Sequence, residues 1–172
     1  GNWTNDVKIH SFTIDNLNII YVSGYFRGTV DFYPSLGVTS LTAAPGYISG
    51  YFAKYDANGN FLFVKELVGL QAGFGTDFPV MEIKVDNAYN IYLTGVFSAN
   101  INDFDPGAGT VGLSSLSGSQ DIFYAKYTNT GNYVYVNSFG TSNSNDEAGS
   151  ISVELATGKV IIGGHAYAGS GN

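Results

Sequence analysis

Cysteine is missing from the 172 residues of the chain, which excludes disulfide bonds, thiolate metal centres and cysteine nucleophiles. Charge is scarce: charged residues make up 12%, and seven Lys and Arg stand against fourteen Asp and Glu, for a net charge of −7. This acidic balance argues against nucleic acid and anionic membranes as partners, since both need a basic footprint. No apolar run reaches the roughly 18 residues of a membrane-spanning helix, so we expect no membrane insertion.

Aromatic residues and glycine are abundant instead. The chain has 13 Tyr and 12 Phe, and hydrophobic residues make up 44%, a composition that suits a globular domain with a sizeable core. Large aromatic side chains favour strands. The 23 glycines fall singly between apolar runs, as turn residues do. No window of ten or more residues shows the periodicity of a helix, so we predict an all-β fold.

The chain repeats three phrases in the same order. Their separations are 71 or 72 residues, and the pairs are "IYVSGYF" (20–26) with "IYLTGVF" (91–97), "VDFYPSLG" (30–37) with "NDFDPGAG" (102–109), and "YFAKYDANGNF" (51–61) with "FYAKYTNTGNY" (123–133). Internal repeats of this length indicate a unit of supersecondary structure that stacks on its neighbours.

One repeat contains four short strands by its residue pattern. In the second copy we expect them at 82–86, 90–98, 121–128 and 132–140. The last strand should place Tyr133 and Tyr135 on one face and Val134 and Val136 on the other. Gly131 suits the tight turn before it. Four sequential antiparallel strands at a fixed period predict the blade of a β-propeller.

About two and a half units of roughly 70 residues fit the chain. We assign 1–10 to the tail of a preceding blade, 11–81 to blade repeat 1, 82–149 to blade repeat 2, and 150–172 to a truncated blade repeat 3. A closed propeller needs about 4 to 8 blades, so the chain does not close alone. We expect a fragment of a longer protein; assembly of several copies and an open stack are the alternatives.

The incomplete third unit has a structural consequence. Apolar residues of its last strand, Val160 and Ile162 or Ile161, should lie bare on an unpaired edge. We therefore expect the chain to associate when expressed alone.

The string "DFDPGAGT…DIFYAKYTNTGNYVYV" resembles the bacterial β-propeller repeat family sometimes called SBBP. The resemblance covers about residues 10 to 167. It implies a scaffold without general catalytic activity, found in large secreted and surface proteins, some of them adhesin-like. The first unit departs from the pattern, with Tyr33 where the second has Asp105, and Ser35 where the second has Gly107.

One loop has the residues of a cation site. Four oxygen-bearing side chains lie within six residues, Asn100, Asn102, Asp103 and Asp105, and hard cations such as calcium need several oxygens close together. The competing interpretation is a loop in which Asp103 accepts hydrogen bonds from local N–H groups. The first unit keeps Asp31 at the position of Asp103. This suggests a structural Asp and an optional metal, and calcium is the one cofactor that we consider.

Other polar residues have structural explanations. "DANGN" (56–60) begins like a calcium loop, but the second copy replaces its acid with Thr128, so we interpret it as a hairpin turn. Lys54, Lys126 and Asp121 stand out among so few charges. We expect the lysine stems to pack on aromatic rings and their heads to meet carboxylates across the sheet.

No catalytic constellation is evident. His10 and His165, the two histidines, have no partner serine motif, and Glu82, Asp146 and Glu147 are not placed across a substrate by any pattern. We predict a non-enzymatic scaffold or interaction module of a larger extracellular or cell-surface protein. Its partners are other blades of the same protein or other chains. The alternatives are a calcium- or glycan-dependent adhesin module and a non-catalytic part of a larger enzyme.

Overall fold

The computed structural model describes residues 5–72, 81–98, 102–142 and 144–167. These residues form antiparallel β-sheets, with a single 3-10 turn at Leu116–Gly118 and no α-helix in the described ranges. The all-β prediction is therefore confirmed.

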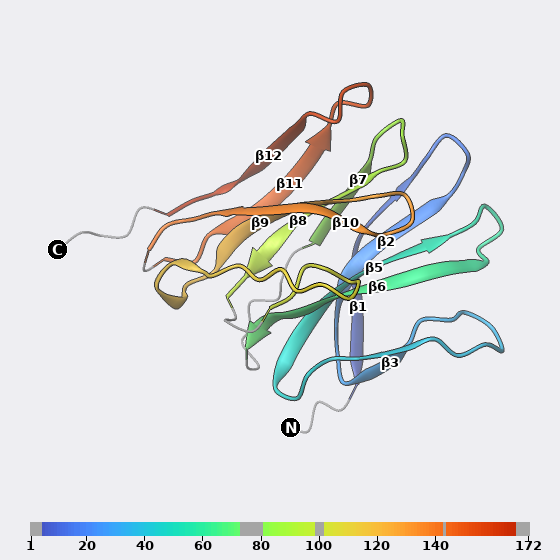
Figure 1. Ribbon diagram of the computed structural model, residues 1–172, viewed down its shortest axis with the longest axis horizontal. Helices are drawn as coiled ribbons and strands as arrows, with labels where there is room; N and C mark the ends of the chain where they lie inside the picture. The colour runs from blue at the N-terminus through green and yellow to red at the C-terminus, as the bar shows by residue number, and fades with distance from the viewer. Residues whose placement is uncertain (1–4, 73–80, 99–101, 143, 168–172) are drawn as a thin grey trace.

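Three sheets follow one another along the chain (Figure 1). The first sheet has the order β1 (Asp6–Ile14), β2 (Ile20–Arg27), β5 (Tyr47–Tyr55), β6 (Phe61–Ala72). The second has the order β7 (Met81–Val85), β8 (Ile91–Phe97), β9 (Asp121–Tyr127), β10 (Tyr133–Phe139). The third contains β11 (Glu147–Val153) and β12 (Val160–His165). A side hairpin of β3 (Thr29–Asp31) and β4 (Ser40–Thr42) leaves the first sheet between β2 and β5.

The repeated phrases fold alike. The pairs β5–β6 and β9–β10 are both antiparallel hairpins, and their turns place Gly59 and Gly131 at φ of 82° and 78°. Only glycine adopts this left-handed backbone at no steric cost, which explains its return in both copies. The four strands predicted for the second unit are confirmed, with small differences at their ends.

The prediction for the faces of β10 is wrong. The register of β10 against β9 shifts between Tyr133 and Tyr135, so Val134 is an extra, bulged residue. Tyr133 and Val136 consequently pack against the main core, whereas the ring of Tyr135 lies 6.2 Å from that of Tyr124. An irregular register of this kind leaves no mark on the alternation of tyrosine and valine.

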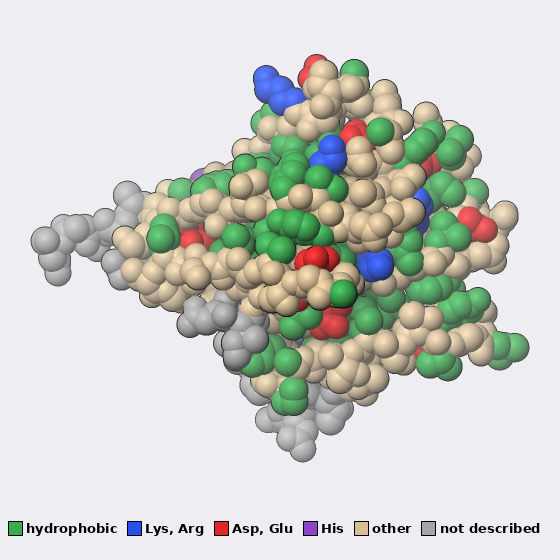
Figure 2. Space-filling model, viewed as in Figure 1, with side chains coloured by type: hydrophobic (Ala, Val, Ile, Leu, Met, Phe, Trp, Pro, Cys, Tyr) green, Lys and Arg blue, Asp and Glu red, His purple; other side chains and the backbone are tan. Residues whose placement is uncertain are grey.

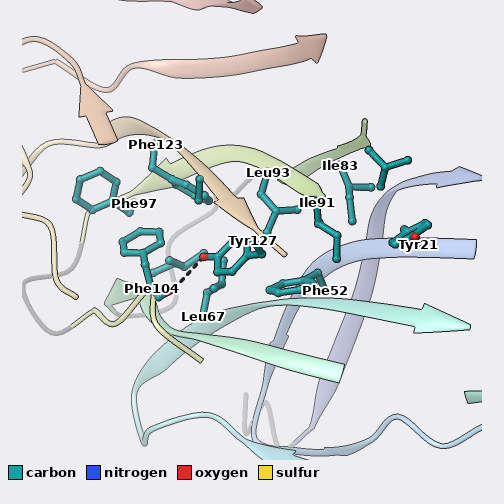
Figure 3. Close-up of a cluster of buried hydrophobic side chains, with 13 residues drawn as sticks. Tyr21, Phe52, Leu67, Ile83, Ile91, Leu93, Phe97, Phe104, Phe123 and Tyr127 are labelled. Atoms are coloured by element: carbon teal, nitrogen blue, oxygen red, sulfur yellow. Dashed lines mark hydrogen bonds between the residues drawn. The ribbon is translucent and has the colours of Figure 1, made fainter. Parts of the chain in front are cut away.

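The largest core lies between the first and second sheets (Figure 3). Tyr21, Phe52 and Leu67 of the first sheet belong to the same core as side chains from β7, β8 and β9, and two partly buried residues of β10, Tyr133 and Val136, pack against it. Fully buried members include Ile83, Ile91, Leu93, Phe123 and Tyr127. The Tyr127 hydroxyl donates a hydrogen bond of 2.9 Å to the carbonyl of Phe104. Tyr21 and Tyr127 thus help to fill the interface between the first two units.

The sheets stack through their first strands. β7 contacts β1 and β2, and β11 contacts β7, β8 and β9. A smaller apolar cluster of Val96, Ile122 and Ala148 joins the second sheet to the third. The side hairpin covers part of the opposite face of the first sheet, where Phe26, Phe32 and Tyr51 are buried.

Candidate functional site

The loop predicted to hold a cation is organised by backbone hydrogen bonds. Asn100 lies outside the described residues. The amide of Asn102 pairs with the backbone of Leu113, accepting its N–H at 2.7 Å and donating to its carbonyl at 2.8 Å. Asp103 Oδ1 accepts the N–H groups of Asp105 and Val111, each at 2.9 Å. Asp105 Oδ1 in turn accepts the N–H of Gly107 at 2.8 Å.

The first unit makes the same loop without the second carboxylate. Asp31 Oδ1 accepts the N–H groups of Tyr33 at 3.0 Å and Thr39 at 2.8 Å, the positions that match Asp105 and Val111. Both hydrogen bonds lower the pKa of Asp31, and the bond from the Thr39 N–H has the larger effect. A metal is therefore not needed to explain the aspartate shared by both loops. Within the described ranges, no three Asp, Glu or His side chains gather as a metal cluster, and calcium at this loop stays a prediction.

Aspartates also organise the tight turns. Asp56 Oδ1 accepts the N–H groups of Asn58 and Asn60, each at 2.8 Å, so "DANGN" is a hairpin turn, as predicted. Asp15 and Asp86 form similar turns, and each also accepts the hydroxyl of a tyrosine, Tyr21 at 3.0 Å and Tyr92 at 2.9 Å.

The two lysines complete these clusters. Lys54 Nζ lies 5.0 Å from the centre of the Tyr21 ring, and Lys126 Nζ lies 5.0 Å from that of Tyr92. Lys126 Nζ also lies 4.0 Å from Asp86 Oδ2. Both ammonium groups lie over tyrosine rings. The expectation of a carboxylate partner is confirmed for Lys126 and wrong for Lys54, whose Nζ donates a hydrogen bond of 3.0 Å to the carbonyl of Asn129.

The histidines and acidic residues have separate partners. The His10 ring lies 6.2 Å from the Tyr25 ring, and His165 Nδ1 lies 3.8 Å from Glu147 Oε2 on the surface. Glu82 accepts a hydrogen bond of 3.0 Å from the hydroxyl of Ser11, which links β7 to β1. In Figure 2, the basic side chains on the face in view are few and scattered.

A hollow of about 250 Å³ lies where the first turns of the three units meet. Its wall includes Asn16, Lys84, Asn87 and Tyr89. The Tyr89 hydroxyl donates to Asn16 Oδ1 at 3.3 Å, and the Asn87 N–H donates to the carbonyl of Leu155 at 3.1 Å. These two bonds tie the turns of successive units together, so the hollow is part of their contact.

Exposed apolar side chains gather on β1 instead. They lie on the face of the first sheet that is turned away from the second, and we call them the N-end face: Val7, Ile9, Phe12 and Ile14. Phe12 pairs with Val22 across β1 and β2, and Val22 packs in the cluster under the side hairpin. Phe12 is 65% exposed and Ile14 is 52% exposed.

The second unit buries the same positions. Ile83 and Val85 stand 71 residues after Phe12 and Ile14, and they are 0% and 8% exposed. Both belong to the core between the first and second sheets, beside Tyr21. The position is therefore apolar in both units and is buried where a preceding sheet packs on it.

Apolar side chains are also exposed at the other end of the stack, on the second sheet. Three aromatic side chains on the face of the second sheet that is turned away from the first remain partly exposed, and we call them the C-end face: Tyr124, Tyr135 and Phe139. Phe52 and Leu67, 72 residues before Tyr124 and Phe139, are fully buried. The Phe52 ring lies 4.7 Å from that of Tyr127 on β9, the third strand of the next unit. The described part of the third unit has two strands, so it covers less of its neighbour.

The last strand agrees with its prediction in part. Ile161 is exposed, as expected. Val160 and Ile162 are half-buried, and Ile162 packs against the cluster of Val96, Ile122 and Ala148, so of the two alternatives only the one that leaves Ile161 bare holds. The sequence patterns did not single out the residues of the N-end face as a binding surface. The signal was present in the spacing of 71 between Phe12 and Ile83, because a repeat position needs the same neighbour in each unit.

No family model matches the chain, and no curated protein matches it. No helix in the described ranges has the length and apolar character needed to cross a membrane.

Proposed function

We propose that the chain is a non-catalytic, repeat-built β scaffold, a segment of a β-propeller of the SBBP type in a secreted or cell-surface protein. Its end faces receive further sheets of the same repeat. The family and the location rest on the resemblance of the repeat phrases. The scaffold role rests on the packing of the units.

One observation carries the proposal. The same apolar repeat position is buried in the second unit, at Ile83, and exposed in the first, at Phe12. Each fully buried side chain of this size contributes about 1.5–3 kcal/mol to stability relative to an exposed one. A further sheet that packs on the N-end face would therefore stabilise the assembly in the same way as the contact between the first and second sheets stabilises the chain. Repeats that stack face to face derive their stability from such neighbour contacts.

The N-end face is expected to bind a further sheet of the same repeat. That sheet would contact it with the face that, in the first sheet, packs on the second. That face offers Tyr21, Phe52, Leu67 and Leu70, all fully buried in the chain. The C-end face offers aromatic side chains at the matching positions, Tyr124 and Phe139. The two ends are therefore complementary, and repeated head-to-tail contact of this kind closes into a ring when the rotation between units allows it.

Size-exclusion chromatography with light scattering tests the proposal on the full chain. We expect masses above that of the monomer that rise with protein concentration. Phe12→Asp should lower the mass toward the monomer, because it places a charge on the N-end face. Leu36→Asp is the matched control, since Leu36 is fully exposed on the loop after β3. A monodisperse monomer for the unaltered chain at every concentration would overturn the proposal.

A further inference from the structure

Two buried carboxylates lie together where the second sheet meets the third. Asp121 begins β9 and is 2% exposed, and Asp146, just before β11, is 0% exposed. A Cβ placed on Gly140 would lie 2.5 Å from Asp146 Oδ2 and 2.6 Å from Asp121 Oδ1. Both carboxylates thus border one point, and glycine is required at 140 because any side chain would collide with both.

The hydrogen bonds leave one of these oxygens without a partner. Asp146 accepts the N–H and the hydroxyl of Thr141, at 2.7 and 3.1 Å, and the N–H of Tyr167 at 3.0 Å. Asp121 Oδ2 accepts the N–H of Leu116 at 2.9 Å. Asp121 Oδ1 is fully buried and has no hydrogen-bond partner among the described residues. This orphaned oxygen is one of the two carboxylate oxygens that border the Cβ position of Gly140.

The chain supplies no positive charge to the pair. Burying a carboxylate away from water is costly unless a charge or a set of donors compensates it. No lysine, arginine or histidine in the described ranges pairs with Asp121 or Asp146, and the remaining residues contain none of these types. Burial raises the pKa of Asp121, and the neighbouring charge of Asp146 raises it further; the Leu116 N–H and the Ser119 hydroxyl lower it, but the net change is an increase.

We infer that Asp121 and Asp146 form the anionic side of a binding site for a hard divalent cation, with calcium as the best match. Calcium prefers carboxylate, carbonyl and hydroxyl oxygens. Ser119 Oγ lies within hydrogen-bond distance of the carbonyl oxygens of Leu116 and Thr141, at 2.6 and 3.2 Å, so oxygens of all three kinds gather near Asp121. With two carboxylates, we expect a dissociation constant of about 10⁻⁴ to 10⁻³ M.

The first unit has no carboxylate at the position of Asp121. Ser49 stands 72 residues before Asp121 in the first unit, and its hydroxyl accepts the N–H of Gly69 at 3.3 Å. It is also distinct from the loop of Asp103 and Asp105, whose hydrogen bonds are accounted for. The inference does not depend on the scaffold proposal, since it concerns the charge of one corner of the chain.

The test uses the full chain, with thermal melting in EDTA and in about 5 mM calcium, and with terbium luminescence excited through tyrosine. We expect calcium to raise the melting temperature by a few degrees and terbium to bind saturably, with calcium as a competitor. Asp121→Asn should abolish both effects and, in EDTA, melt no lower than the unaltered chain. Asp121→Ser, which copies Ser49 of the first unit, provides a second variant.

Asp105→Asn is the matched control, because it removes a carboxylate from the other acidic loop. It should keep the calcium response. The inference is overturned if calcium leaves the melting temperature of the unaltered chain unchanged. That result is expected if the two carboxyl groups share a proton and bind no cation. It is also overturned if the response survives in Asp121→Asn or disappears in Asp105→Asn.

Discussion

Alanine substitutions of Ile83 and Phe12, made one at a time, compare one repeat position in two environments. Ile83 is fully buried between the first and second sheets, and Phe12 is 65% exposed on the N-end face. Ile83→Ala removes three carbon groups at about 0.8 kcal/mol each and leaves a cavity, so we expect a loss of about 3 kcal/mol in the free energy of unfolding. For a chain of this length, that lowers the melting temperature by roughly 6–12 °C.

Phe12→Ala should cost about 1 kcal/mol or less in the dilute chain, although it removes the larger side chain. Two thirds of Phe12 already faces water, so its truncation forfeits little burial. Urea unfolding at low protein concentration, followed by far-UV circular dichroism, measures both losses, and equal m-values make them comparable. An equal or larger loss for Phe12→Ala would refute the reasoning, because it would mean that the free chain already covers its N-end face.

Two further predictions concern hydrogen bonds in the repeat. Tyr127→Phe should lower the free energy of unfolding by about 1–2 kcal/mol, because it leaves the buried carbonyl of Phe104 without its hydrogen bond. Tyr55→Phe removes the longer bond of 3.3 Å to the Phe32 carbonyl and should lower that free energy clearly less. Equal losses measured by urea unfolding would contradict this prediction. Burial raises the pKa of Asp86, but hydrogen bonds from Asn90, Tyr92 and Ala88 outweigh it and lower the pKa. The stability from this depressed pKa is complete above the unfolded value of about 3.9 and is lost as pH falls through the folded one, so Asp86→Asn should flatten the acid limb of the stability curve; parallel curves for both proteins would contradict it.

Much of the local structure follows from the sequence by itself. The repeat period, the strands of the second unit and the turns at Gly59 and Gly131 depend on neighbours along the chain, so residue patterns determine them. The turn role of Asp56 was predictable for the same reason, because an aspartate reaches the N–H groups two and four residues ahead.

Tertiary structure decided which positions are covered and which charges meet. The bulge at Val134, which the first unit repeats at Leu62, turns Tyr133 and Tyr135 to different faces, and the alternation of tyrosine and valine does not reveal it. Phe12 and Ile83 have the same apolar character, and only the presence of a neighbouring sheet separates an exposed side chain from a buried one. Asp121 and Asp146 lie 25 residues apart in the sequence, and the stacking of the third sheet on the second brings their carboxylates together at Gly140. Contacts between sheets depend on how whole faces stack, and a single strand's pattern carries no record of that.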